Sequence, residues 1–484
     1  MTLVRLSPAL AALTLAAAAC VDAPRVAGPN AALQPRFAAT SAGATTVATG
    51  RHIVAFSGAV PASFARQVAA LGGTVLWVSP ETGLAAVSGL TASAAATLAG
   101  SPGIQTVDAD EALSLDIPAM AAADAADAAG VASPTDPAGA ARYARQWNMR
   151  AVRADSAWAH GFLGSGDVSI FMLDTGIDYL HADLVGRVDL ARSVDMLGTF
   201  SVNGVSFTEA DTVAKYFPTR LPITDMFFHG THTAATVSSN AARAAGITSM
   251  TTLVAVKVCD YFGSCPFSSI LNGVLYAAEQ GADVVNMSLG GFFTKAHNGR
   301  FVGLLNKTFN FARSRGVTVV VSAGNAALDL QHIGNTYATF CDTPAVICVA
   351  ATGPTAEASV NGPWTNIDAP AFYTNFGRGD IDVAAPGGND GAFVWAACSQ
   401  TILAIPSLKV CSTAPTFIVG AEGTSMSAPH VSGTAALLVP ILGRDPARIK
   451  TQIEQAADQI GGNGMTPFYG HGRINVARAV GAIP

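Results

Sequence analysis

The chain has 484 residues, of which 50% are hydrophobic and only 12% are charged, and its formal net charge is -6. One compact domain rarely reaches this length, so we expect several domains. The composition excludes a disordered polyelectrolyte, and the lack of a Lys/Arg cluster excludes a typical nucleic-acid binder.

The N-terminus holds the only run in the sequence that resembles a membrane segment, over residues 3–19. We interpret residues 1–20 as a secretory signal peptide, so the mature protein is predicted to be exported without a transmembrane span. The alanines before Cys20 resemble a bacterial lipoprotein signal, in which that cysteine is acylated. An ordinary signal peptide cut near residue 19 is the alternative. The predicted location is extracellular or periplasmic, either free or held by a lipid anchor at Cys20.

The next part of the chain is predicted to be a tether followed by a small domain. Residues 21–50 are rich in Ala, Thr, Gly and Pro without an apolar period, which favours a flexible tether. Strand and helix patterns then alternate up to residue 115 and predict a small α+β domain over 51–115. The strand patterns cover 52–56, 73–78, 84–87 and 104–110, and the helix patterns cover 62–71 and 91–100.

Residues 116–142 consist largely of Ala, Asp and Pro without a large apolar period, so we expect a linker that contains a maturation site. Buried-strand patterns alternate with helix patterns over 143–484. The strand patterns cover 168–173, 252–258, 283–287 and 317–321, and the helix patterns cover 229–243, 268–280, 304–315 and 425–442. This alternation predicts an α/β fold in which helices cover both faces of a parallel sheet. Ligands of such sheets bind at the carboxyl ends of the strands.

Six further cysteines form three pairs that are close in sequence: Cys259 with Cys265, Cys341 with Cys348, and Cys398 with Cys411. In an exported protein they are expected to form disulfides, and local pairing is favoured among the fifteen connectivities. A structural zinc site is improbable because the sequence has no Cys-x-x-Cys. 

Four polar residues stand where strands end or helices begin. Asp174 follows a strand, Asn325 follows another, and His229 and Ser425 each open a helix pattern. Considered alone, a serine before an apolar helix, such as Ser425, is more often an N-cap residue than a nucleophile. His229 with His232 could be a packed pair or metal ligands. Pro429 is expected in the first turn of the last helix, which would then begin at Ser425.

Taken together, these residues and their motifs resemble the subtilisin-like serine proteases (subtilases). The motifs occur in the family's order: Asp174-Thr-Gly-Ile-Asp178, His229-Gly-Thr-His232, Asn286-Met-Ser-Leu-Gly-Gly291, Ala323-Gly-Asn325 and Gly423-Thr-Ser-Met-Ser-Ala-Pro-His430. The resemblance extends from Gln146 to about Ala479. It implies a subtilisin-like fold, polypeptide substrates and no cofactor for the chemistry.

The resemblance also implies a role for each residue. Ser425 would be the nucleophile, His229 its base and later the acid, and Asp174 the carboxylate that orients His229. The side-chain amide of Asn325 and the N–H of Ser425 would hold the oxyanion. The segment 51–115 resembles the family's inhibitory propeptide, a small ferredoxin-like domain, so the protein's own N-terminal domain is an expected partner.

Two glycine-containing segments would form the walls of a cleft for an extended peptide. They comprise Ser288, Leu289, Gly290 and Gly291 on one side and Ser322, Ala323 and Gly324 on the other. Simple glycine turns are the alternative. Because large residues are scarce in these walls, we expect an apolar or aromatic substrate side chain before the scissile bond.

Some positions depart from the family pattern. Thr233-Ala-Ala235 replaces a usual Val-Ala-Gly, which we expect to be a small change outside the catalytic triad. Insertions are expected near residues 197–222 and around Cys398 and Cys411. Many relatives bind calcium, yet no dense run of Asp and Asn ligands occurs in this sequence, so calcium has no predicted position and no metal site is predicted.

The sequence therefore predicts a secreted or surface-tethered serine endopeptidase that is made as an autoprocessed zymogen. Two alternatives remain open: a catalytically silent binding protein with the same fold, and a peptide acyl-transferase or macrocyclase that uses the same acyl-enzyme.

Overall fold

The computed structural model describes residues 46–121, 123–125, 131–202, 205–296 and 299–484. The predicted signal peptide 1–20, the lipidation of Cys20 and most of the predicted tether 21–50 lie outside the described residues. The last five residues of that tether belong to the first strand, which begins at Thr46.

The first part of the described chain is a four-stranded antiparallel sheet with two helices. Its elements follow in the order β1 (Thr46–Phe56), α1 (Phe64–Ala70), β2 (Thr74–Ser79), β3 (Leu84–Ser88), α2 (Ala92–Ala99) and β4 (Ile104–Ser114). The strand order β4-β1-β3-β2 is that of a ferredoxin-like βαββαβ unit. Val54, Phe56, Phe64, Val68 and Leu98 form its buried core.

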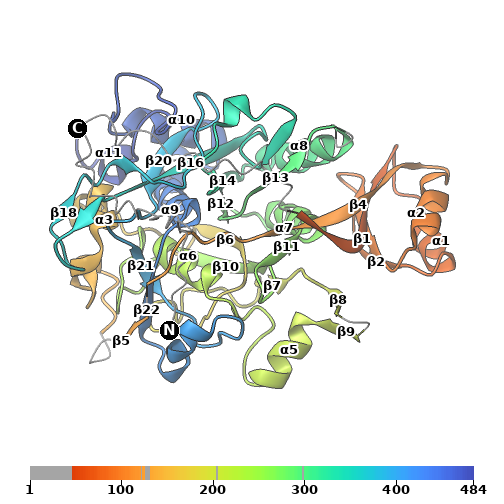
Figure 1. Ribbon diagram of the computed structural model, residues 1–484, viewed down its shortest axis with the longest axis horizontal. Helices are drawn as coiled ribbons and strands as arrows, with labels where there is room; N and C mark the ends of the chain where they lie inside the picture. Colours follow the sequence, from red (N-terminus) through yellow and green to blue (C-terminus); the bar gives the residue numbers. More distant parts are fainter. Residues whose placement is uncertain (1–45, 122, 126–130, 203–204, 297–298) are drawn as a thin grey trace, which may run out of the picture. The chain divides into compact units, whose positions relative to one another are not determined.

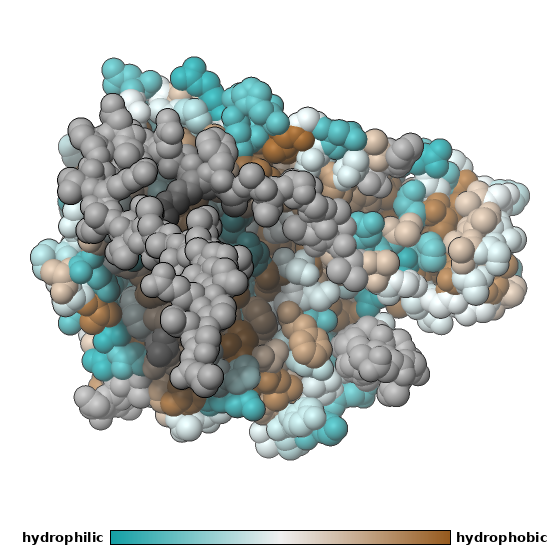
Figure 2. Space-filling model, viewed as in Figure 1, coloured by the Kyte–Doolittle hydropathy of each residue, from teal (hydrophilic) through white to brown (hydrophobic). Residues whose placement is uncertain are grey.

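The two helices of this part lie beside each other (Figure 1). The solvent side of α2 consists of Ala, Ser and Thr side chains. The surface over these helices is accordingly pale to light brown in Figure 2. 

The larger part is built on an eight-stranded sheet with the order β19-β16-β14-β12-β6-β10-β7, in which β20 also pairs with β16. Its strands are β6 (Ser169–Asp174), β7 (Val194–Asp195), β10 (Thr252–Lys257), β12 (Val284–Met287), β14 (Thr318–Ser322), β16 (Val346–Gly353), β19 (Ala369–Pro370) and β20 (Val383–Pro386). All adjacent pairs are parallel except β16 with β19. The predicted α/β class and parallel sheet are confirmed.

Helices cover both faces of this sheet because its strands are apolar on both sides. Ile170 and Met172 of β6 face one core, whereas Phe171 and Leu173 face the other. The first core includes α6 and α9, which pack against each other, and the second includes α7 and α8 (Figure 1). The helices are α3 (Trp147–Ala151), α4 (Ala154–Ala159), α5 (Glu209–Tyr216), α6 (His229–Val237), α7 (Phe267–Glu279), α8 (Gly299–Ser314), α9 (Thr424–Leu442), α10 (Pro446–Ala456) and α11 (Val476–Ala479).

The remaining elements of the described residues are short strands and 3-10 helices. The strands are β5 (Asp124–Ala125), β8 (Thr199–Val202), β9 (Val205–Thr208), β11 (Ser264–Pro266), β13 (Gly291–Thr294), β15 (Thr336–Thr339), β17 (Ala356–Glu357), β18 (Trp364–Thr365), β21 (Val394–Ala397) and β22 (Phe417–Ala421). Single 3-10 turns span Pro137–Gly139, Tyr143–Arg145 and Leu330–His332, and a longer 3-10 helix spans Pro406–Thr413.

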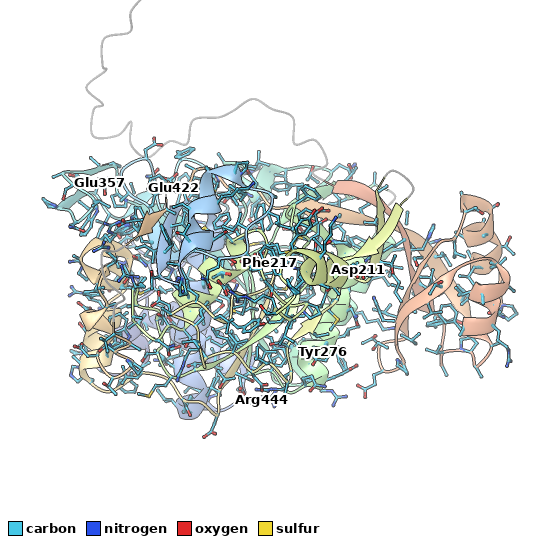
Figure 3. All side chains as sticks on the ribbon, turned by 90° about the horizontal axis from the view of Figure 1, so that it is seen from below. Asp211, Phe217, Tyr276, Glu357, Glu422 and Arg444 are labelled. Atoms are coloured by element: carbon cyan, nitrogen blue, oxygen red, sulfur yellow. A yellow bond between two sulfur atoms is a disulfide. The ribbon has the colours of Figure 1, made fainter. Side chains whose placement is uncertain are left out.

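The region near 197–222, expected to be an insertion, contains β8, β9 and α5. A capping box between Thr208 and Asp211 opens α5, on which Asp211 is labelled in Figure 3. Glu209 of this helix forms a fully buried ion pair with Lys257 of β10, at 2.8 Å. The insertion is therefore attached to the sheet edge by a buried charge pair.

Helix α6 is shorter than predicted. It ends at Val237 rather than Arg243, and the chain then turns, with Ala241 in the left-handed region at φ 55°. The N–H of Asn240 donates to the carbonyl of Asp183 at 2.7 Å, and the N–H of Arg243 donates to the Asp183 carboxylate at 2.7 Å. These long-range acceptors replace the helical ones, which a local pattern does not reveal.

Candidate active site

Asp174 and His229 form a buried pair at the carboxyl end of β6. Nδ1 of His229 lies 2.7 Å from Oδ1 of Asp174, and both side chains are fully buried. The N–H of Thr175 donates to the same oxygen at 2.7 Å, and the Thr233 hydroxyl donates to Oδ2 at 3.1 Å. Within the described part of the chain, Nε2 of His229 has no hydrogen-bond partner. A carboxylate thus fixes one ring nitrogen and leaves the other available.

The carboxylate of Asp225 connects the loop after Asp174 to the helix that begins at His229. Its fully buried carboxylate accepts hydrogen bonds from the Thr175 hydroxyl at 2.9 Å and from the N–H and hydroxyl of Thr231 at 2.9 and 2.6 Å. Burial raises the pKa of Asp225, and these hydrogen bonds oppose the rise. Asp225 is not among the predicted site residues, although an acid just before a helix is a recognisable capping signal.

Gly230 lets the loop after β6 approach helix α6 closely. A Cβ at this position would lie 2.1 Å from the carbonyl oxygen of Gly176. The N–H of Gly230 also donates to the Thr175 hydroxyl at 2.9 Å. The glycine that follows His229 in the motif is therefore a packing requirement of the Asp174–His229 contact.

Ser425 lies in the first turn of α9, where its backbone N–H has no helical acceptor. Its hydroxyl donates to the carbonyl of Ser288 at 3.1 Å, and the Ser288 hydroxyl donates back to the carbonyl of Ser425 at 2.8 Å. The expectation that Pro429 lies in the first helical turn is wrong, because α9 begins at Thr424 and Pro429 follows in the second turn. Its missing N–H leaves the carbonyl of Ser425 free to accept from Ser288.

Asn325 lies beside the start of α9 and is oriented by Thr424. The N–H and hydroxyl of Thr424 donate to Oδ1 of Asn325 at 2.9 and 2.8 Å. The side-chain N–H₂ is thereby directed away from Thr424, and it donates to the carbonyl of Asp116 at 2.7 Å. Asn375 holds the loop that carries Asn325, because it donates to the carbonyl of Ala323 at 2.8 Å and accepts from the N–H of Ala326 at 3.1 Å.

The chain on either side of Asp116 is extended and pairs with the larger part of the protein. Before Asp116, β4 pairs antiparallel with β11, and the N–H of Leu115 donates to the carbonyl of Gly263 at 2.8 Å. After it, the N–H of Glu422 donates to the carbonyl of Ala119 at 3.0 Å, and β5 pairs antiparallel with β22. Figure 3 labels Glu422, whose pKa is raised to about 7 mainly by burial. The segment 116–142, predicted to be a linker with a maturation site, therefore begins with residues that pair with the larger part of the protein.

The two predicted walls of the cleft are hydrogen-bonded to each other, and one of them is hydrogen-bonded to the start of α9. The Ser322 hydroxyl donates to the carbonyl of Leu289 at 3.2 Å, and the N–H of Gly324 donates to the Thr424 hydroxyl at 3.0 Å. Gly290 and Gly291 are partly exposed, whereas Ser288, Leu289, Ser322 and Ala323 are buried. The backbone pairing of residues 112–115 runs to β11 and Gly263, a strand that the sequence analysis did not assign to the site.

Two other histidines near the pair are packed rather than free. Nε2 of His232 lies 3.1 Å from the carbonyl of Val394, and burial lowers its pKa to about 3. His430 lies 2.9 Å from the Asn148 amide, and burial lowers its pKa to about 4. Both are therefore neutral at pH 7, and of the two uses considered for His232 the packed one holds.

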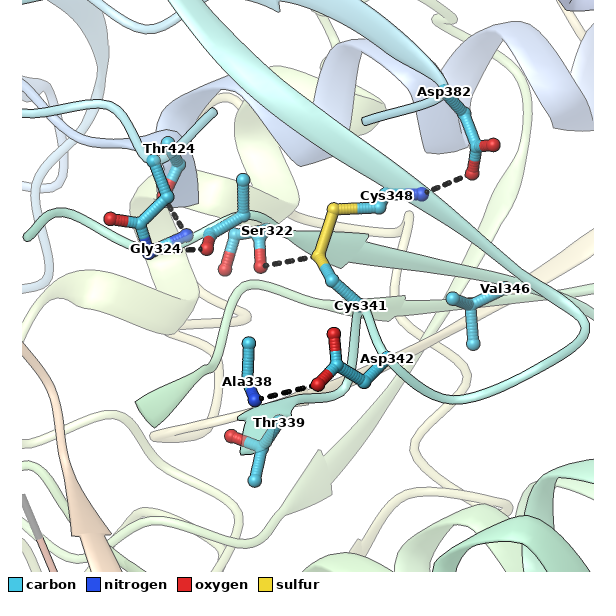
Figure 4. The surroundings of a disulfide bond; sticks show 12 residues. Ser322, Gly324, Ala338, Thr339, Cys341, Asp342, Val346, Cys348, Asp382 and Thr424 are labelled. Carbon is cyan, nitrogen blue, oxygen red and sulfur yellow. Dashed lines mark hydrogen bonds between the residues drawn. A yellow bond between two sulfur atoms is a disulfide. The ribbon is translucent and has the colours of Figure 1, made fainter. Parts of the chain in front are cut away.

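All three predicted disulfides are present: Cys259–Cys265, Cys341–Cys348 and Cys398–Cys411. Figure 4 shows Cys341–Cys348 beside Ser322 and Gly324, at the strand end that leads to Asn325. The bridge Cys259–Cys265 closes a loop that contains Gly263 and ends in β11. Two of the three bridges therefore brace segments next to the candidate site.

Two further features bear on ligands and membranes. Over the ranges that the structure describes, no group of three or more His, Cys, Asp or Glu side chains is placed to hold a metal ion. One described helix, α9, is long and apolar enough to cross a membrane, but 83% of the apolar window is buried inside the protein. Helix α9 is therefore accounted for as a core helix.

Comparison with known proteins gives matches that cover most of the chain. Residues 165–472 match the Subtilase family of peptidases. Thermitase from Thermoactinomyces vulgaris is 31% identical over 342 residues, which are 70% of this chain and 96% of that protein. Subtilisin from Bacillus pumilus is 30% identical over 336 residues, which are 68% of this chain and 96% of that protein.

Two solved structures share the fold. The epidermin leader peptide processing serine protease of Staphylococcus aureus has a TM-score of 0.64 at 20% identity, and the match covers 89% of this chain and 97% of that one. A lanthipeptide protease has a TM-score of 0.55 at 21% identity, with 73% of this chain and 99% of that one covered.

Proposed function

The chain belongs to the subtilase family and is a subtilisin-like serine endopeptidase, and from that premise we propose that Asp174, His229, Ser425 and Asn325 carry its chemistry. The observation that carries the assignment is the buried 2.7 Å contact between His229 and Asp174, which leaves Nε2 unpartnered among the described residues. Family membership makes polypeptides the substrates.

His229 is the general base in this proposal. A serine hydroxyl is a weak nucleophile at neutral pH and needs a base to accept its proton as it attacks. The hydroxyl of Ser425 must leave the carbonyl of Ser288 and turn toward Nε2 of His229 to become that nucleophile. His229 then returns the proton to the leaving amine, and Asp174 stabilises the imidazolium between the two transfers.

Asn325 and the N–H of Ser425 hold the oxyanion in this proposal. Negative charge develops on the former carbonyl oxygen, and donors that are already oriented stabilise it without reorganisation. The two hydrogen bonds from Thr424 supply that orientation for Asn325. The N–H of Ser425 adds the positive end of the α9 dipole.

We further propose that the protein is exported as a zymogen with residues 1–20 as signal and the domain 51–115 as an inhibitory propeptide. The supporting observation is the segment 112–121, which occupies backbone partners on both sides of the site. The three disulfides support an oxidising compartment outside the cytoplasm.

The test of the catalytic assignment compares Ser425→Ala with the wild type after export from a bacterial host. We expect the variant to lose casein hydrolysis and to remain at full precursor length, because no other hydroxyl can form the acyl-enzyme. Gel mobility and casein turnover are the measurements. Ser427→Ala, two residues further along the same helix, is the matched control and should be processed and active. Casein hydrolysis by the Ser425→Ala variant would refute the assignment.

A further inference from the structure

The carbonyl of Asp116 contacts the proposed oxyanion donor. It accepts from Nδ2 of Asn325 at 2.7 Å, and Asn325 is the amide that we assign to the oxyanion. An oxyanion donor contacts the carbonyl whose carbon is attacked. The peptide bond that follows this carbonyl joins Asp116 to Ile117.

The backbone on each side of this bond is held as a bound peptide would be. Leu113 pairs with Cys265 in antiparallel register, and the N–H of Leu115 donates to the carbonyl of Gly263. On the other side, the N–H of Ala121 donates to the carbonyl of Gly420 at 2.9 Å, and Met120 forms a bridge with Ala421. β22 ends at Ala421, shortly before α9 begins, so the bond between Asp116 and Ile117 passes the helix end that carries Ser425.

The side chains before the bond alternate between buried and exposed. Leu113 is 1% exposed and belongs to the core that includes Phe267. Leu115 is partly buried and packs in the cluster that contains Phe228 and Met426, the neighbours of His229 and Ser425. Ser114 and Asp116 are exposed. The protein therefore packs against the side chains of the second and fourth residues before the bond, Leu115 and Leu113. The side chain directly before the bond, Asp116, is exposed.

We propose that Asp116–Ile117 is the bond cut in autoprocessing, and that the mature enzyme selects substrates by leucine-like residues two and four positions before the scissile bond. The proposal rests on the proposed function of Ser425. It differs from the expectation of an apolar or aromatic residue directly before the bond, because the position directly before it holds the exposed Asp116.

The reaction balances with the groups already named. Oγ of Ser425 bonds to the carbonyl carbon of Asp116 and gives its proton to His229. The bond from that carbon to the nitrogen of Ile117 breaks, and His229 protonates the released amine. Water then hydrolyses the ester, which leaves a carboxylate on Asp116 and restores the Ser425 hydroxyl.

The first experiment determines the primary cut in the full-length precursor. Intact masses of the first two products are recorded over time, for the wild type and for Ser425→Ala. We expect one fragment that ends at Asp116 and another that begins at Ile117 in the wild type, and neither in the variant. A first cut at any other bond, or the same cut in Ser425→Ala, overturns the proposal. If the wild type hydrolyses casein but first cuts elsewhere, only this inference fails and the proposed function stands.

The second experiment uses a synthetic peptide with the sequence of residues 110–121 and the mature enzyme, so folding of the precursor does not matter. Burying one leucine side chain is worth enough that Leu113→Asp and Leu115→Asp should each lower kcat/KM by about tenfold or more. Ser114→Asp, the exposed position between them, is the matched control and should change kcat/KM by less than about threefold. Equal losses at all three positions, or cleavage away from Asp116, contradict the proposal.

Discussion

Three groups hold the carboxylate of Asp174: the ring of His229, the N–H of Thr175 and the hydroxyl of Thr233. Thr233 lies outside the predicted triad, as expected, but its hydroxyl is 3.1 Å from Oδ2. The same hydroxyl lies 3.1 Å from the carbonyl of Gly230, so its single proton is shared between two acceptors. A residue that departs from the family pattern thus contacts the carboxylate of Asp174.

Replacement of Thr233 by valine keeps its shape and removes the hydrogen bond. We expect kcat to fall about three- to tenfold with KM unchanged, because Asp174 loses one of the groups that orient it. Peptide hydrolysis measured over a series of substrate concentrations gives both kcat and KM.

Thr236→Val is the control for this change, because the Thr236 hydroxyl is equally buried on α6 but donates to the carbonyl of His232 at 2.9 Å. It should leave kcat unchanged. Equal effects of the two variants would mean that Thr233 acts only through the stability of α6.

The sequence motifs identified four candidates because each motif indicates a local backbone conformation. The candidates are Asp174, His229, Asn325 and Ser425. Thr233, Asp225 and Asp116 were missed for a physical reason. Their importance depends on which distant group each one meets, such as the Thr175 hydroxyl for Asp225 and the Asn325 amide for Asp116. A single sequence does not contain that information.

At the scale of elements, the site depends on short segments that are fixed by neighbours. Strand β11 has three residues, and the disulfide Cys259–Cys265 closes the loop that leads into it. The carboxylate of Asp260 adds hydrogen bonds from the N–H groups of Phe262 and Ser264, both at 2.9 Å. The strand that binds residues 112–114 is therefore held by a covalent bridge and by an acidic side chain.

Opening this bridge should loosen peptide binding. For Cys259→Ala with Cys265→Ala we expect a several-fold rise in KM with little change in kcat, together with a loss of stability of about 2–3 kcal/mol from the short closed loop. KM for the peptide 110–121 and the thermal midpoint are the measurements. Cys398→Ala with Cys411→Ala opens the bridge that braces neither β11 nor the two predicted walls, so it should lower the midpoint and leave KM unchanged. An equal rise of KM in both variants would contradict the role of β11.

Local patterns predicted the type of several long elements, but they missed β16, α5 and α10 and did not give every end. Helix α9 begins at Thr424, one residue before the predicted start, and α6 stops at Val237 because Asp183 supplies acceptors to the turn that follows. Helix ends depend on capping partners, and here the partners come from elsewhere in the chain. The short strands β5 and β11 also depend on distant partners, and their sequences carry no apolar period that would reveal them.

At the scale of the whole molecule, the first part of the described chain contacts the larger part through buried charges. The Asp110 carboxylate accepts from the N–H and hydroxyl of Ser268 at 3.0 and 2.6 Å. Burial raises the pKa of Asp110, whereas these bonds and the nearby Arg51 lower it. Arg51 is itself buried and donates to Ser269 at 3.1 Å and to the carbonyl of Leu197. A second contact, between Glu81 and Arg315, is an exposed ion pair.

These two contacts should differ greatly in strength. Asp110→Ala leaves Arg51 buried without its carboxylate, so the cleaved N-terminal fragment should bind the rest of the protein about 30-fold or more weakly. Glu81→Ala removes an exposed pair and should weaken binding by less than about threefold. Co-elution of the two fragments over a dilution series measures both. Similar effects of the two changes would argue against a buried electrostatic anchor.

The small antiparallel sheet with its two helices and the larger α/β part both follow from patterns that the sequence displays, because each has its own buried core. The contacts between these two parts do not follow from such patterns. Trp77 donates to the carbonyl of Ser268 at 3.1 Å, and neither residue stands out in its own segment. The surface through which the two parts contact each other can therefore be identified only from the folded structure.

Cleavage after Asp116 would leave the two halves of the extended segment attached to the protein in different ways. The part that ends at Asp116 would then belong to a separate fragment, which dilution can remove. The part that pairs with β22, which includes Ala121 and β5, would remain covalently joined to the larger part of the protein. A short tether maintains a local concentration in the range of about millimolar, whatever the volume of the solution. The acyl side of the cleft would therefore open by dissociation, whereas a substrate would have to displace the enzyme's own N-terminus from the leaving-group side.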